Sequence, residues 1–441
     1  MHFIVGHSAE HREKGNKEMK SRLTREERNW VLYDIGNSAF VLLVSTIIPI
    51  YFNYLAENAG ISAVDYLAFW GYAASAVTII VALIGPVFGT LADTQGLKKP
   101  IFTITVLVGA IGCLALGFAR QWIAFLVIYM IAKTGFSGSL IFYDSMLGDV
   151  TTEDRVDDVS SQGYAWGYIG SCVPFIVCLG VVLGAGWIGI STELAMMLSF
   201  AIVAVWWIAA TIPLLKSYKQ KHYVVRQSRA VQNSFKRLGI TLKNVRNEKK
   251  IFLFLLAFFF YIDGVYTIID MATAYGTALG LDSTGLLLAL LVTQLVAFPF
   301  AILFGRLSKR YDTEKLILIC IVAYFGIAVF AVFLKEQWQF WFLAILVGMF
   351  QGGIQALSRS YFTKIIPAEK AGEYFGLMDI CGKGASFLGT IVISLVSQFT
   401  GQVNIGVGAI SLFFILGMIV FKMSATEGIK EIDNNVNINF M

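Results

Sequence analysis

Three polar side chains lie on one apolar stretch of the sequence, near residues 122–147. They are Lys133, Ser137 and Asp144, and their separations of four and seven residues place them on one face of a helix. An ionisable group at bilayer depth costs several kcal/mol unless it faces a partner or a water-filled cavity. The spacing therefore predicts a polar stripe that lines a cavity or pairs with another helix.

Similar stripes occur on three other apolar stretches. They are Asp34, Asn37 and Ser45; Asp263, Thr267 and Asp270; and Gln351, Gln355 and Arg359. Together these groups could hold a small zwitterion, with Lys133 or Arg359 on its carboxylate and Asp263 on its amine. Lys133 could instead pair with an acid, such as Asp144 or Asp263, and only hold helices together. The expected binding residues are Asp34, Asn37, Lys133, Ser137, Tyr261, Asp263, Tyr266, Gln351, Gln355 and Arg359.

The elements that must position these stripes are twelve apolar stretches, arranged in two sets of six. Each stretch is long enough to cross a hydrocarbon core about 30 Å thick as a helix. The composition of 57% hydrophobic and 14% charged residues leaves too little polar surface for a water-soluble fold. The predicted fold is all-α integral membrane, with twelve transmembrane helices in two six-helix bundles. The spans are expected near 30–56, 66–92, 99–118, 122–147, 163–184, 193–215, 251–279, 284–306, 315–334, 338–364, 374–397 and 403–423.

The charges of the loops predict how these spans are oriented. With a cytoplasmic N-terminus, almost all loop Lys and Arg lie inside, and the other side keeps little beyond Arg120 and Lys335. One loop departs from this pattern, because the segment from Asp149 to Asp158 is acidic although it is assigned to the inside. Both termini are expected in the cytoplasm. The expected parts are a basic tail at 1–28, a bundle at 29–216, a basic connector at 217–250, a second bundle at 251–424 and a tail at 425–441.

Several classes of protein are disfavoured by what the sequence lacks. The five cysteines fall inside predicted spans without a CxxC pair, so neither disulfides nor a zinc site are expected. The basic residues lie in loops that meet lipid headgroups, which argues against nucleic acid. HExxH, GxSxG and GxxxxGK[ST] motifs are absent. Tyr143 and Asp144 supply only one half of an intramembrane aspartyl protease, so no enzyme, metal or cofactor is expected.

A loop with the composition of a gate follows the second predicted span. Glycine permits a tight reversal, and carboxylate and ammonium groups can pair with the ends of helices. The loop runs Gly89, Thr90, Leu91, Ala92, Asp93, Thr94, Gln95, Gly96, Leu97, Lys98 and Lys99, with a weaker echo from Gly305 to Lys315. The expected gate residues are Gly89, Asp93, Gly96, Lys98, Lys99, Arg310, Asp379 and Lys383.

At this loop the chain resembles the major facilitator superfamily. Thr94 departs from the superfamily pattern, which has a basic residue there, and Lys309 stands in the echo where a second aspartate would be. The resemblance implies that the first, fourth, seventh and tenth spans line a central cavity. These are the four spans that carry the polar stripes.

Two further runs resemble the narrower vacuole-effluxer-like family. They are Trp30, Tyr33, Asp34, Asn37 and Ser38, and Gln351, Gly352, Gly353, Gln355, Ala356, Leu357, Ser358, Arg359 and Ser360. Fungal members of that family export amino acids from vacuoles. The resemblance therefore implies a secondary active transporter of a small polar solute, such as an amino acid, that works by alternating access, with efflux as one direction that the family suggests.

The driving force is expected to be a proton gradient or a sodium gradient. Asp144, Asp263 or Asp270 could take up a proton, since apolar surroundings favour the neutral form of a carboxyl group, while sodium could use the same oxygens. Two alternatives stay open, a nutrient receptor that does not transport and a flippase for a lipid-like amphiphile. We expect a monomer in the cell membrane whose partners are lipid and a small solute.

Overall fold

The computed structural model describes residues 22–225, 240–241, 243, 245 and 248–439 of the 441-residue chain. Within helices, the side chains of 63–64, 66–68, 273–274, 277–278, 283–284, 287, 383–387 and 428–439 are not among those described. Most of the predicted N-terminal tail and much of the connector therefore lie outside the described residues.

The N-terminal half contains the first six predicted spans. The first begins at Arg25 because Thr24 and Glu27 form a capping box, and it breaks at Thr46 into two helices. The helices of the N-terminal half are α2 (Arg25–Ser45), α3 (Ile47–Asn58), α4 (Ala63–Ala92), α5 (Lys98–Leu116), α6 (Trp122–Ser145), α7 (Leu147–Val150), the short 3₁₀ helix η1 (Glu153–Arg155), α8 (Val156–Leu183), α9 (Ala185–Ile188) and α10 (Thr192–Ser217).

The C-terminal half repeats this plan. Its helices are α12 (Lys249–Ala278), α13 (Ser283–Leu307), α14 (Thr313–Val332), α15 (Gln337–Ile365), the 3₁₀ helix η2 (Ala368–Lys370), α16 (Ala371–Thr400), α17 (Val403–Ala409) and α18 (Ser411–Asn439). Two predicted boundaries were wrong. The fifth span begins at Val156 rather than near 163, since Asp157 and Asp158 suit the first turn of a helix, and α18 continues past 423 to Asn439.

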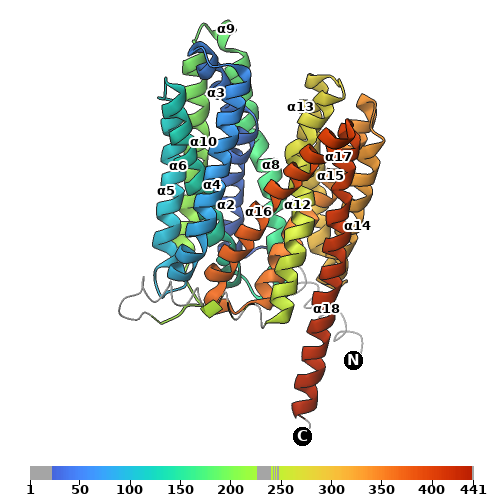
Figure 1. The fold of residues 1–441 in the computed structure, drawn as a ribbon. Helices are drawn as coiled ribbons and strands as arrows, with labels where there is room; N and C mark the ends of the chain where they lie inside the picture. Colours follow the sequence, from blue (N-terminus) through green and yellow to red (C-terminus); the bar gives the residue numbers. More distant parts are fainter. Residues whose placement is uncertain (1–21, 226–239, 242, 244, 246–247, 440–441) are drawn as a thin grey trace, which may run out of the picture.

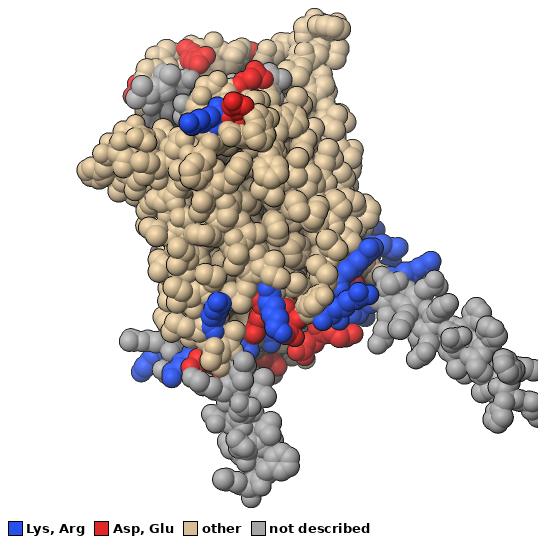
Figure 2. Space-filling model, turned by 90° about the vertical axis from the view of Figure 1, so that its right-hand side faces the viewer, with Lys and Arg blue, Asp and Glu red and all other residues tan. Residues whose placement is uncertain are grey.

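The lengths and hydropathies of these helices confirm the predicted membrane fold. Eleven spans among the described residues are long and apolar enough to cross a bilayer. α16, the other predicted span, is 30 residues long, and its segment Leu388–Thr400 is apolar. Figure 2 shows charged side chains at the two ends of one face, with a wide band of other residues between them. That band suits contact with acyl chains.

The two halves meet through a small set of helix pairs. Within the N-terminal half α2 packs on α8 and α10, and within the C-terminal half α12 packs on α16 and α18. Between the halves, α4 contacts α16, while α8 contacts α13 and α15. The start of α2 and the end of α18 lie at one end of the molecule, and the ribbons of the two halves diverge toward the other end (Figure 1). From the positive-inside rule we expect the end with the start of α2 to face the cytoplasm.

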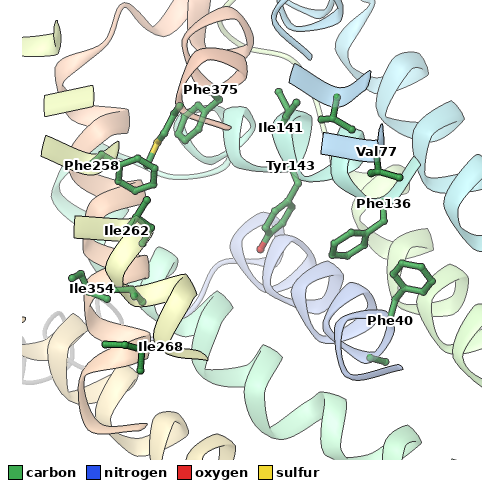
Figure 3. Close-up of a cluster of buried hydrophobic side chains, with 14 of the residues drawn as sticks. Phe40, Val77, Phe136, Ile141, Tyr143, Phe258, Ile262, Ile268, Ile354 and Phe375 are labelled. Atoms are coloured by element: carbon green, nitrogen blue, oxygen red, sulfur yellow. The ribbon is translucent and has the colours of Figure 1, made fainter. Parts of the chain in front are cut away.

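Each half has its own buried apolar side chains. In Figure 3, Phe40, Val77 and Phe136 lie on the side of the N-terminal half, and Ile262 and Ile354 on the other. Close packing of such side chains restricts movement within each half. Most of the polar side chains described next lie between the two halves or at the end where the halves meet, and two lie inside the C-terminal half.

Candidate functional site

The side chain of Arg359, on α15 of the C-terminal half, extends into the N-terminal half and lies among its residues. Its Nη1 donates to Asp144 Oδ1 at 3.0 Å and lies 3.6 Å from Asp34 Oδ2. Its Nε donates to Ser160 Oγ and its Nη2 to the Ser160 carbonyl, each at 2.9 Å. One cation of the C-terminal half therefore joins α2, α6 and α8.

Aromatic rings cover the same guanidinium. The ring centroids of Trp30, Tyr143 and Tyr164 lie 4.7, 5.5 and 4.3 Å from its Cζ atom. These distances permit cation–π attraction, and the Arg359 side chain is only 3% exposed. Gly163 makes room, because a Cβ there would lie 3.0 Å from Nη2. We call the surrounding residues the Arg359 socket: Trp30, Asp34, Tyr143, Asp144, Ser160 and Tyr164.

A second polar group lies between the halves. Lys133 on α6 is close enough to Asp270 on α12 for their charges to interact across the two halves. Tyr266 lies within electrostatic reach of Asp270, of Asp144 and of Asp379 on α16. Asp270 is exposed and the others are partly exposed, so solvent reaches between the halves here. We call these five residues the vestibule.

Gln351, Gln355 and Asn37 border these two groups. Tyr168, on α8, lies with its hydroxyl 3.5 Å from Gln355 Oε1, and Gln351 is also close to this phenol. Asn37 Nδ2 donates to the Tyr33 carbonyl at 3.1 Å and lies 3.4 Å from Asp34 Oδ1. The two glutamines therefore meet the N-terminal half, and Asn37 supports Asp34. Ser137 is buried within α6.

Tyr261 and Asp263, in contrast, lie inside the C-terminal half. The Tyr261 hydroxyl is 2.7 Å from Ser358 Oγ. Asp263 Oδ1 accepts from the Gly389 N–H at 3.0 Å and from Thr267 Oγ1 at 3.2 Å, and Oδ2 has no hydrogen-bond partner among the described residues. Both side chains are 0% exposed, so neither reaches the vestibule in this conformation.

One contact between the halves joins α4 to the N-terminus of α16, at the loop predicted to be a gate, and we call this contact the first gate. Asp93 Oδ1 accepts from the Gly372 N–H at 2.8 Å, and Oδ2 accepts from the Glu373 N–H at 2.9 Å. N–H groups in the first turn of a helix lack partners within the helix and attract negative charge. The backbones also touch, since a Cβ on Gly89 would overlap the Gly372 carbonyl oxygen.

Lys98 forms an ion pair with Asp93 of this gate. It is fully buried, and its Nζ lies 3.6 Å from Asp93 Oδ1 and 3.7 Å from Asp149 Oδ2. Burial raises the pKa of Asp93 to about 6, although Lys98 and the two backbone N–H groups favour its charged form. Tyr218, at the start of the connector, donates to Asp149 Oδ2. The gate loop is therefore tied to α7 and to the connector.

The other predicted gate residues contribute less to these contacts. Gly96 adopts a φ of 76°, which favours glycine, and its N–H donates to Gln220 Oε1 at 3.0 Å. Lys99 and Arg310 are exposed. The side chain of Lys383 lies outside those described.

A further contact at the same end joins α8 to the loop after α13, to α14 and to α15, and we call it the second gate. Lys309 Nζ lies 2.8 Å from Asp158 Oδ2, and Lys364 Nζ lies 2.6 Å from Asp157 Oδ2. Thr313 Oγ1 donates to the same Asp157 oxygen at 2.7 Å. In the first gate, Asp93 of the loop after α4 binds the N-terminus of α16. In the second gate, Lys309 of the loop after α13 binds Asp158, an acid in the first turn of α8.

The sequence analysis did not predict the second gate. Two signals pointed to it: the acidic loop among basic ones, and Lys309 in place of an aspartate. Spacing alone could not join them, because Asp158 and Lys309 are 151 residues apart. The partners of Arg359 on α8 were missed for the same reason.

Reversing the charge of Lys309 should weaken the second gate. Lys309→Glu would set two carboxylates against each other, but Lys309 is 45% exposed, so we expect only about 1 kcal/mol, or a roughly fivefold shift toward an open cytoplasmic side. Distances between spin labels on the two halves would measure this shift. Adding Asp158→Lys should restore part of it, and Lys315→Glu, in a pair within its own half, should leave the distances unchanged.

The hydrogen bonds and ion pairs described between the halves lie in the gates, in the socket or beside Tyr168. Toward the outer end the ribbons separate (Figure 1). The halves therefore touch at the end that carries the gates, and because we expect that end to face the cytoplasm, we take this to be the outward-facing conformation. Two halves of membrane-spanning helices that close at one end around shared charged groups define a transporter of the major facilitator superfamily.

Comparison with known proteins narrows this class. The family described as "Vacuole effluxer Atg22 like" matches residues 23–157 and 149–432. The "Uncharacterized MFS-type transporter YxiO" of Bacillus subtilis (strain 168) is 42% identical over 424 residues, 95% of this chain and 99% of that protein. The chain thus belongs to the Atg22-like family, a multi-pass membrane family that is not enzymatic.

More distant proteins share parts of this likeness. Autophagy-related protein 22-2 of Aspergillus clavatus is 24% identical over 273 residues, 56% of this chain and 44% of that protein. Among solved structures, the major facilitator superfamily transporter FucP in the outward conformation gives a TM-score of 0.67 at 15% identity, over 91% of this chain and 97% of that one. The likeness to FucP concerns the fold alone.

Proposed function

We propose that this transporter moves a small zwitterionic metabolite, such as an amino acid, by alternating access driven by a proton gradient. The observation that carries the proposal is that Lys133 and Asp270, on opposite halves, lie close enough for their charges to interact, with Asp270 exposed and Lys133 partly exposed. An ammonium group and a carboxylate can together hold the two charges of a zwitterion. The family description as effluxers supports export as the direction to test first.

The vestibule residues of the two halves could bind opposite ends of the substrate. Lys133, on α6, would hold the carboxylate of the substrate, and Asp270, on α12, would hold its amine. Tyr266 and Asp379 add a hydroxyl and a further acid on the C-terminal half. A substrate held from both sides favours closure of the halves around it, which alternating access requires. The bacterial relative supports a place in the cell membrane, and we expect a monomer.

Labelled amino acids in proteoliposomes test this function. A thermal-shift screen of amino acids, peptides, sugars and nucleosides would first find a binder, because a ligand of the folded state raises the melting temperature. Counterflow of that solute, followed at imposed pH and sodium gradients, would show transport and its driving ion. Binding without counterflow would indicate a receptor instead.

Lys133→Met should reduce counterflow at least tenfold, since the substrate carboxylate would lose its cation, an interaction of about 1.5–3 kcal/mol. Asp270 is exposed, so water can solvate its charge and the fold should remain stable. Lys335→Met, at the exposed outer end, is the matched control and should transport normally. Normal binding and counterflow in Lys133→Met would remove Lys133 from the substrate site.

Asp263→Asn tests one of the three proposed proton carriers, Asp144, Asp263 and Asp270. Asparagine keeps an oxygen for the Gly389 N–H and for Thr267, whereas the unpartnered Oδ2 position becomes an amide that cannot take up a proton. We expect counterflow to persist and uptake driven by a pH gradient to be lost. Uptake that still follows the pH gradient would exclude Asp263 and leave Asp144 or Asp270.

A further inference from the structure

All three guanidinium nitrogens of Arg359 donate to protein groups in the outward-facing conformation. Its Nε, Nη1 and Nη2 atoms each donate a hydrogen bond to Ser160 or Asp144. Trp30 and Tyr164 lie within 5 Å of the guanidinium, with centroids at 4.7 and 4.3 Å. A substrate carboxylate therefore cannot reach this cation here, although the sequence suggested Arg359 as its partner.

The socket contains more negative charge than Arg359 neutralises. Asp34 and Asp144 both approach its Nη1, at 3.6 and 3.0 Å, so two carboxylates share one guanidinium. Asp34 is buried, and besides Arg359 its carboxylate has the neutral Tyr143 hydroxyl and the Asn37 amide close by. Asp144 is 27% exposed, and its charge also interacts with that of Asp379.

When the cytoplasmic side opens, the Arg359 side chain must move out of the socket. Arg359 belongs to α15, whereas Asp34, Asp144 and Ser160 belong to α2, α6 and α8 of the other half. Alternating access moves one half against the other, so it withdraws Arg359 from these partners. Two carboxylates would then remain beside each other in an apolar protein, and an uncompensated buried charge is strongly destabilising.

We infer that Asp34 and Asp144 form a cation site, which Arg359 fills in the outward-facing conformation and which an incoming positive charge fills when the cytoplasmic side opens. That charge is a proton or the ammonium group of the solute. Arg359 thus acts as a tethered substitute for the transported charge. This inference rests on the proposed transport function, and it assigns to Arg359 a role other than binding the substrate carboxylate.

The groups that face this site come from every neighbouring helix. Besides Arg359, Asp144 is within electrostatic reach of Asp34 on α2 and of Asp379 on α16. Five phenols also surround the site, and these are Tyr33 on α2, Tyr143 on α6, Tyr164 and Tyr168 on α8 and Tyr266 on α12. Arg359 is the cation in hydrogen-bond contact with these acids. Its withdrawal therefore leaves an excess of negative charge.

Chemical rescue tests the cation site directly. Arg359→Ala should melt several degrees below the wild type, and millimolar methylguanidinium should restore part of that loss by entering the space left by the side chain. Tetramethylammonium, which cannot donate hydrogen bonds, should not do so. Neither cation should stabilise the wild type or Arg310→Ala, whose arginine is exposed. A folded Arg359→Ala protein that methylguanidinium does not stabilise would overturn the inference.

Spin-label distances provide a second test that does not need Arg359→Ala to fold. Labels at Glu153 and Tyr311, which are exposed and lie at the cytoplasmic ends of different halves, report opening. In the wild type the longer distance should gain population as the pH falls, or on adding methylammonium at constant pH. The first response identifies a proton and the second an ammonium group. Asp34→Asn combined with Asp144→Asn should lose the response, and an unchanged response would contradict the site.

The two proposals can fail separately. Normal counterflow with no methylguanidinium rescue and an unchanged pH response in the double variant would leave the transport function standing and remove the cation site. Rescue of Arg359→Ala without counterflow of any solute would keep the cation site and remove the proposed transport.

Discussion

Replacing Gly89 with valine should abolish transport and hold the cytoplasmic side open. A Cβ at this position would overlap the carbonyl oxygen of Gly372 on α16, and backbone cannot move aside as a flexible side chain can. The first gate would then be unable to form, so Asp93 would lose the N–H groups of Gly372 and Glu373. Spin labels at Glu153 and Tyr311 should report the longer distance at every pH.

Gly71→Val is the matched control on the same helix. Nothing lies within 4 Å of a Cβ at Gly71, so this substitution should leave both the distances and counterflow near those of the wild type. Loss of transport in both variants would point to a general effect of valine in α4. Normal closure in Gly89→Val would show that α4 and α16 do not need this close approach.

Replacing Lys98 with methionine should destabilise the protein by about 3–5 kcal/mol, the usual cost of breaking a buried ion pair by removing one partner. Lys98 is 0% exposed and lies between Asp93 and Asp149, so its removal leaves two buried carboxylates without their shared cation. Thermal unfolding in detergent would measure the change as a lower melting temperature.

Its neighbour in the sequence provides the control. Lys99 is exposed, so Lys99→Met should change the melting temperature little. Adding Asp149→Asn to Lys98→Met should recover part of the lost stability, because one of the two unpaired charges is then removed. Equal stabilities for Lys98→Met and Lys99→Met would contradict the role assigned to this cluster.

The membrane fold could be predicted from the sequence because it depends on local properties. Window hydropathy and loop charge do not require knowledge of which helices touch, and the superfamily resemblance supplied the arrangement of the halves. The errors lay at boundaries such as the start of α8. There Asp157 and Asp158 look like loop residues, yet they suit the first turn of a helix and face Lys364 and Lys309.

The polar stripes predicted faces of helices but not partners. Lys133 and Asp144 share a face, yet eleven residues separate them by about 16 Å along the helix axis, so they meet different groups. Lys133 interacts with Asp270, whereas Asp144 bonds to Arg359. Spacing along one helix fixes direction and depth, whereas pairing depends on how two rigid halves meet.

The same limit explains why Asp263 and Asp270 differ. They are seven residues apart on α12, which places them on one side of the helix. Asp270 is exposed, whereas Asp263 is fully buried beside Gly389, because the α16 backbone approaches α12 at that depth. Sequence spacing contains no information about where a neighbouring helix comes close.

The contrast between the two gates implies unequal sensitivity to ionic strength. Asp93 is buried against backbone amides, so dissolved ions screen its attraction to α16 only weakly. Lys309 meets Asp158 while almost half exposed to water, and dissolved salt weakens such an exposed ion pair. When osmotic stress raises the salt concentration of the cytoplasm, the second gate should therefore weaken before the first. The halves would then separate first where α8 meets the loop after α13.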